Sequence, residues 1–186
     1  MKYFKSDENW QYNSRLSKVD NKWLFYGEGY RQASELLEKQ ILQIDRSNQD
    51  FLIYPYCYLI RHYIEIRLKE IIDQGNSLNG ITINPSKGGH NLSVLWRDSR
   101  EALKLVWKNQ YKEAPKDVSQ FIDEFHTIDV KSDNFRYPID TNGKETLVNI
   151  EKINFKKLTE VFEIVKNYLE GITDELAVAK DDIGLC

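Results

Sequence analysis

Apolar side chains recur at steps of three and four residues through most of this 186-residue chain. That spacing places them along one face of an α-helix, whereas a half-buried strand needs strict alternation. Trp23, Tyr26 and Tyr30, for example, begin one such face. The pattern predicts five helical segments, at about 21–44, 50–74, 90–107, 115–129 and 154–179.

The connections between these segments predict how the helices are arranged. Short connections favour antiparallel packing of neighbouring helices. The longest connection, residues 129–149, loses the helical period, and Thr141, Asn142 and Gly143 within it are typical of a hairpin turn. We therefore predict an all-α fold, an antiparallel bundle of about five helices, with a long polar loop and a small β-hairpin between the last two.

The second predicted helix is the most apolar and is expected at the centre of the bundle. Pro55 is expected in its first turn or so, because a proline further inside removes a hydrogen bond and clashes with the preceding turn. The length of the chain suits one hydrophobic core, so residues 1–186 are predicted to form a single helical domain. Residues 1–20 are expected to be irregular and residues 180–186 to fray.

The composition limits the functions that the chain can have. Its formal net charge of -3 provides no global positive field for holding a polyanion, so any contact with nucleic acid must be local. The longest uncharged apolar stretch, Phe51 to Ile60, is too short to span a bilayer, and the first residues lack a secretory signal. The two cysteines do not form a disulfide framework. We predict a cytoplasmic protein that does not enter a membrane.

The sequence lacks the motifs of the common catalytic and cofactor sites. It contains no glycine-rich phosphate loop, GxSxG, HExxH or CxxC motif, and it has three histidines. The histidines and carboxylates show no spacing typical of metal ligands. We predict neither a cofactor nor a metal site.

A first group of polar residues lies on the second predicted helix. Arg61 and Glu65 are four residues apart and can pair on one face. This face is either solvated or, because the helix is otherwise apolar, part of a cleft or an oligomer interface. Arg67 falls within the apolar arc, where a structural ion pair is favoured. The members of the polar face are Tyr58, Arg61, His62, Glu65 and Lys69.

A second group, His90 and Asn91, precedes the third predicted helix. The N–H groups at a helix N-terminus attract anions, and a histidine can exchange a proton near neutral pH. Equally, Asn91 could be a simple N-cap and His90 a residue that packs a loop.

A third group, His126, Asp129, Arg136 and Tyr137, lies around the start of the long polar loop. Loops of this length are either functional or held by their own contacts. Arg136 lies between two aromatic residues and could stack on a base or bind a phosphate. It could equally lock the loop to Asp129 or Glu65.

Three stretches of the sequence resemble the HEPN superfamily over about residues 22–172. They are the helix RHxxExxLK that starts at Arg61, the GHNL that starts at Gly89, and the FHxIDxxSxxFRYP that starts at Phe125. The resemblance implies a bundle of four or five helices, frequent homodimerisation, and a role in bacterial toxin–antitoxin, antiviral defence or RNA-processing systems.

Active HEPN ribonucleases carry an arginine four to six positions ahead of a histidine, and none of the three histidines here has an arginine at that spacing. A HEPN-like module of bacterial defence or stress systems that binds RNA, a nucleotide or a partner protein is therefore the first hypothesis. The alternative is a metal-independent endoribonuclease with a rearranged site. The catalytic candidates are Arg61, His62, Glu65 and His90, and the ligand-binding candidates are Lys69, Asn91, His126, Asp129, Arg136 and Tyr137.

A third hypothesis is a structural or immunity subunit that sequesters a partner through an exposed apolar face. Trp10, Trp96 and Trp107 would be its contacts if they are exposed, because aromatic side chains often anchor interfaces.

Overall fold

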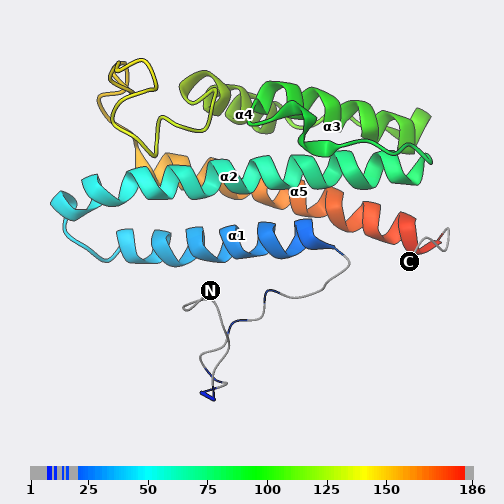
Figure 1. Ribbon diagram of the computed structural model, residues 1–186, viewed down its shortest axis with the longest axis horizontal. Helices are drawn as coiled ribbons and strands as arrows, with labels where there is room; N and C mark the ends of the chain where they lie inside the picture. The colour runs from blue at the N-terminus through cyan, green and yellow to red at the C-terminus, as the bar shows by residue number, and fades with distance from the viewer. Residues whose placement is uncertain (1–7, 10, 12–13, 15, 17–20, 183–186) are drawn as a thin grey trace.

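A computed structural model describes residues 21–182, together with residues 8, 9, 11, 14 and 16 (Figure 1). Within residues 21–182 the chain forms five α-helices and two short 3-10 helices. The predicted irregular segment 1–20 lies largely outside the described residues. The elements are α1 (Lys22–Ile41), α2 (Arg46–Leu78), η2 (Pro85–Gly88), α3 (Leu92–Trp107), η3 (Lys108–Gln110), α4 (Lys116–Ile128) and α5 (Phe155–Asp182).

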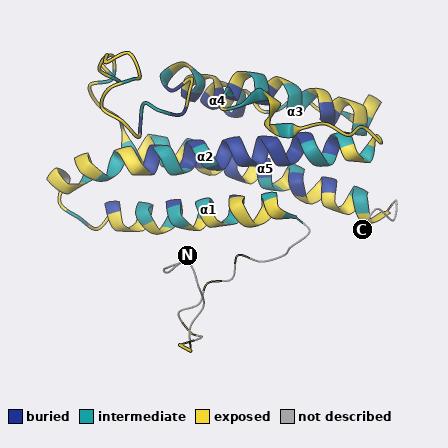
Figure 2. Ribbon diagram, in the orientation of Figure 1, coloured by how far each residue is buried: buried dark blue, intermediate teal, exposed yellow. Residues whose placement is uncertain are grey.

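Helix α2 is the centre of the fold, as its apolar sequence predicts. It packs against α1, α3 and α5, while α4 packs against α3 and α5 (Figure 1). Every residue from Tyr63 to Ile72 is buried, and Figure 2 shows that burial concentrates along this helix. Since α2 is surrounded on several sides, polar residues on it must find partners inside the protein.

The start of α2 differs from the prediction. The helix begins at Arg46 rather than near residue 50, so Pro55 lies well inside it and not in its first turn. Gln49 stabilises the turns ahead of the proline, because its Nε2 donates to the carbonyl of Ile41, 3.2 Å away, at the end of α1. Pro55 itself is exposed, so water can reach the backbone groups that its ring leaves unpaired.

The segment predicted as a β-hairpin forms no strand in the described part of the chain. It contains one isolated antiparallel bridge, between Ile139 and Glu145. The carboxylate of Asp140 accepts the backbone N–H groups of Asn142 and Lys144 at 2.8 and 2.9 Å, and Gly143 takes a positive φ of 77°. The turn is therefore present. The backbone N–H groups of Asp140 and Thr146 also donate across it, to the carbonyls of Lys144 and Pro138 at 2.8 and 3.0 Å, but this pairing is too short to form strands.

The last helix also extends further than predicted. Residues 180–182, expected to fray, continue α5 to Asp182, and residues 183–186 lie outside the described part of the chain. Among the helices that the structure describes, none combines the length and apolar character needed to cross a membrane.

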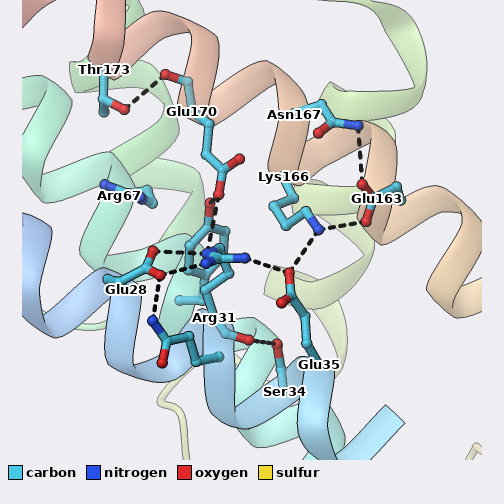
Figure 3. A network of polar contacts seen from close by, with 12 residues as sticks. Glu28, Arg31, Ser34, Glu35, Arg67, Glu163, Lys166, Asn167, Glu170 and Thr173 are labelled. Carbon is cyan, nitrogen blue, oxygen red and sulfur yellow. Dashed lines mark hydrogen bonds and ion pairs between the residues drawn. The ribbon is translucent and has the colours of Figure 1, made fainter. Parts of the chain in front are cut away.

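Charged side chains link α1 to α5 across one side of the bundle (Figure 3). Arg31 donates to Glu28 and Glu35, and Lys166 lies between Glu35 and Glu163. The hydrogen bond from Arg31 outweighs partial burial and lowers the pKa of Glu28 to about 2. Glu28 is therefore ionised across the physiological pH range.

Arg67 forms the structural ion pair predicted for it. Its Nη1 lies 2.7 Å from Oε2 of Glu70, and both side chains are almost completely buried. A Cβ placed on Gly27 of α1 would lie 3.3 Å from Nε of Arg67, so the absence of a side chain at this position lets α1 approach α2 closely.

Candidate functional site

Arg61 is completely buried at the middle of α2. Its Nε and Nη2 donate to the backbone carbonyl of Asp129 at 3.1 and 2.9 Å, and Nη2 also donates to the carbonyl of His90 at 2.7 Å. Its remaining nitrogen, Nη1, lies 3.1 Å from Oε2 of Glu65. Every nitrogen of the guanidinium thus faces a protein acceptor. Arg61 holds the turn before α3 and the loop after α4 against α2.

Glu65, one turn after Arg61, is also buried and joins three basic residues. Besides Arg61, its carboxylate accepts from Nζ of Lys69 at 2.7 Å and lies 2.9 Å from Nδ1 of His90. Burial raises the pKa of Glu65, but the hydrogen bonds from Lys69 and His90 outweigh burial, and the pKa lies below its ordinary value. Glu65 is therefore an ionised group that orients the imidazole of His90.

The loop after α4 is fixed by Asp129. One carboxylate oxygen, Oδ1, accepts the N–H groups of Asp133 and Asn134 at 2.7 and 3.1 Å, and the other lies 3.4 Å from Nε of Arg61. Ser132 takes a left-handed conformation with φ of 66° inside this turn. Two cations, Arg61 and Lys69, thus face two carboxylates, Glu65 and Asp129, so the buried cluster has no net charge when His90 is neutral.

An open depression lies over this buried cluster, between the start of α3 and the loop after α4. Its volume is about 470 Å³. The side chain of His90 is 56% exposed there, and its Nδ1 is held by Glu65, so Nε2 is the nitrogen available to a ligand. We call it the His90 depression, and it is lined by Gly88, His90, Asn91, Val130, Lys131, Asp133 and Arg136.

Arg136 has a fixed orientation at the edge of the His90 depression. Its Nε donates to the carbonyl of Ser132 and its Nη2 to Oδ1 of Asp133, both at 2.6 Å. The sequence offered Asp129 or Glu65 as partners for Arg136, but the structure shows that Arg136 locks the loop through these nearer residues. Its guanidinium also lies over the rings of Tyr58 and Tyr137, at 5.5 and 5.3 Å from their centroids.

His62 is separated from the His90 depression. Its ring stacks on Tyr58 with centroids 5.6 Å apart and meets the edge of Tyr30 at 4.4 Å. Burial lowers its pKa. His62 is therefore an aromatic packing residue that stays neutral at physiological pH.

The structure brings most of the predicted residues together. Arg61, Glu65, Lys69 and Asp129 form the buried cluster, while His90, Asn91 and Arg136 line the depression above it. Asn91 also caps α3, because its Oδ1 accepts the N–H of Val94 at 3.0 Å. Tyr137 adjoins the site through Arg136. His126, half-buried near the end of α4, is not among the residues that line the depression.

Some residues of this region were not predicted from the sequence, among them Lys131 and Tyr30. Lys131 was not singled out, although it follows Asp129 by two positions in the same loop and lines the depression. Tyr30 was assigned to the apolar face of the first helix, whereas it packs against His62. Of the tryptophans proposed as interface contacts, Trp96 is buried and Trp107 is half-buried, and Trp10 lies outside the described residues.

No protein-family model, curated protein or solved structure matches this chain. Within the part of the chain that the structure describes, no three histidine, cysteine, aspartate or glutamate side chains are grouped so that they could hold a metal ion. The chemistry of the site therefore has to be inferred from its own residues.

Proposed function

We propose that this chain is a HEPN-like module, an antiparallel helical bundle, that binds the phosphate groups of RNA or of a nucleotide in the His90 depression. The observation that carries the proposal is the distribution of charge. The buried cations are balanced by Glu65 and Asp129, whereas the depression is lined by two cationic side chains, Lys131 and Arg136, and by one carboxylate, Asp133, which pairs with Arg136. An excess of positive charge is thus left at the surface, next to an exposed imidazole.

The same geometry favours binding over cleavage. Acid–base cleavage of a phosphodiester normally uses two groups that transfer protons and a cation that contacts the developing charge. Arg61 is completely buried with its donors occupied, so Lys131 or Arg136 would have to supply that cation. His62 lies beneath two tyrosines, so His90 is left as the exposed imidazole in the depression.

One observation supports the alternative of a metal-independent endoribonuclease. Nδ1 of His90 lies 2.9 Å from a buried carboxylate, and such a pair fixes the tautomer of a general acid or base. Incubation with single-stranded RNA distinguishes the two functions. The binding module leaves the RNA intact, whereas cleavage that His90→Gln abolishes would establish the nuclease.

We further propose that the protein acts in the bacterial cytoplasm as a homodimer, in toxin–antitoxin, antiviral or stress-response systems. These roles follow from the sequence resemblance, and no helix that could span a membrane is found in the described residues.

The proposal is tested by the salt dependence of RNA binding, measured by fluorescence anisotropy with a short labelled single strand. Replacing a lysine that contacts a phosphate should weaken binding and lower the slope of log K against log salt by about 0.7. We expect this change for Lys131→Ala. Lys112→Ala is the matched control, because Lys112 is exposed and follows the far end of α3. Equal affinities and slopes for the two variants would refute a phosphate site in the depression.

A further inference from the structure

A series of ring and cation–π contacts, here called the aromatic stack, runs from α1 across α2 to the edge of the His90 depression. Its layers come from α1, α2 and the loop after α4. The ring centroids of Tyr30 and His62 are 4.4 Å apart and those of His62 and Tyr58 are 5.6 Å apart, and the Cζ of Arg136 lies 5.5 and 5.3 Å from the centroids of Tyr58 and Tyr137. In order from α1, the aromatic stack consists of Tyr30, His62, Tyr58, Arg136 and Tyr137.

The outermost layer is held in place but remains open to solvent. Tyr137 is 54% exposed, while the carbonyl of the same residue accepts from Oγ1 of Thr146 at 2.7 Å. Arg136 beneath it is anchored to Ser132 and Asp133. The ring of Tyr137 lies against this anchored guanidinium, so it loses less conformational freedom than an unsupported ring when a planar group stacks on it.

Phe135, the other aromatic neighbour of Arg136, has a different role. It is buried, 6% exposed, and packs against Phe125 with ring centroids 6.0 Å apart. Phe135 thus attaches the loop to the core. Of the two aromatic residues that flank Arg136, only Tyr137 is left to meet a ligand.

We propose that Tyr137 is the stacking platform for an unpaired base whose neighbouring phosphate lies in the His90 depression. The inference rests on the proposed function, since the phosphate is what brings the base to this position. Arg136 belongs both to the depression and to the aromatic stack, so it places the two subsites side by side. A face of a base is free in a single strand and covered in a duplex, so the ligand is single-stranded.

The test compares a short single-stranded RNA with an abasic strand of the same length and phosphate count. Removing an aromatic platform typically weakens binding by about tenfold per stacked base. Wild-type protein should bind the RNA about tenfold more tightly than the abasic strand. Tyr137→Ala should abolish this difference, and Tyr137→Phe, which keeps the ring, should preserve it.

Phe25→Ala is the matched control. Phe25 is an aromatic side chain of similar exposure, 56%, on α1 and outside the aromatic stack. This variant should leave the preference for the base-containing strand unchanged. Loss of the preference in Phe25→Ala as well would show that it does not come from Tyr137.

The outcomes separate the inference from the proposed function. Equal affinity of wild-type protein for both strands, with binding that still depends on Lys131, would refute the stacking platform and leave the phosphate site standing. Failure to bind either strand would refute both. A duplex that binds as tightly as the single strand, with the same loss in Tyr137→Ala, would contradict an unpaired base as the ligand.

Discussion

Replacing Arg61 with alanine should cost more stability than replacing any exposed arginine. Arg61 has no solvent-exposed surface, and it donates to the backbone of both His90 and Asp129. Its removal leaves the carboxylate of Asp129, which is itself fully buried, without a cation. Glu65 keeps Lys69 and His90 as partners, so the uncompensated charge is that of Asp129.

Breaking a buried ion pair by removing one partner costs about 3–5 kcal/mol. For a domain of this size, that loss corresponds to a fall in Tm of about 6 to 20 °C. Thermal unfolding followed by circular dichroism measures the shift, and urea denaturation gives the free energy of unfolding. Arg61→Lys should be intermediate, because a lysine keeps the charge but cannot reach both backbone carbonyls.

The control is Arg97→Ala. Arg97 pairs with Asp98 on the surface, with 60% of its side chain exposed, and such pairs contribute little to stability. We expect this variant to stay within about 0.5 kcal/mol of the wild type. If Arg61→Ala were as stable as Arg97→Ala, Arg61 would not hold the loop and the turn as described.

Three further predictions test the fold. The pKa of Glu28 is lowered from 4.5 to about 2 in the folded state, so its ionised form stabilises the protein at neutral pH, and this contribution is lost as the pH falls through that interval. Glu28→Gln should therefore make the urea midpoint less sensitive to acid. An unchanged pH profile would argue against the pair with Arg31. Burial raises the pKa of the Cys57 thiol to about 12. In a variant whose other cysteine is substituted, Cys57 should therefore resist iodoacetamide until the protein unfolds. Rapid labelling of the folded protein would contradict the burial of Cys57. Gly75→Val should lower the free energy of unfolding by about 1–3 kcal/mol in urea denaturation, because a Cβ there would lie 3.0 Å from an alanine side chain of α3. Gly171→Val, with open space around it, should stay within about 0.5 kcal/mol of the wild type. Equal losses would refute the close approach of α2 and α3.

The helices could be predicted from the sequence because their apolar faces recur over many turns. The starts and ends were harder to place, because they depend on contacts between segments. Gln49 supports the first turns of α2 through the carbonyl of Ile41 at the end of α1, and the helix begins at Arg46, well before Pro55. The predicted hairpin is reduced to one bridge and two backbone bonds around the turn, and the Asp140 carboxylate holds the turn itself.

Only the part of the candidate site that lies on a single helix could be predicted from the sequence. Arg61 and Glu65 are one helical turn apart, so their pairing follows from the sequence. The segments that cover this pair could not be predicted from the sequence, because the backbone partners of Arg61 lie 29 and 68 positions away. The sequence offered a solvated face or, because the helix is otherwise apolar, a cleft or an oligomer interface. The packing of the α3 turn and of the Asp129 loop buries the face instead.

The most direct test of the central claim is an NMR titration of the imidazole nitrogens with a short single-stranded RNA. The chain has three histidines, and substitution of each one assigns its resonances. We predict that the Nε2 signal of His90 shifts on binding, while the signals of His126, which does not line the depression, stay in place. Shifts confined to His126, or RNA binding that leaves His90 unperturbed, would contradict a phosphate site in the His90 depression.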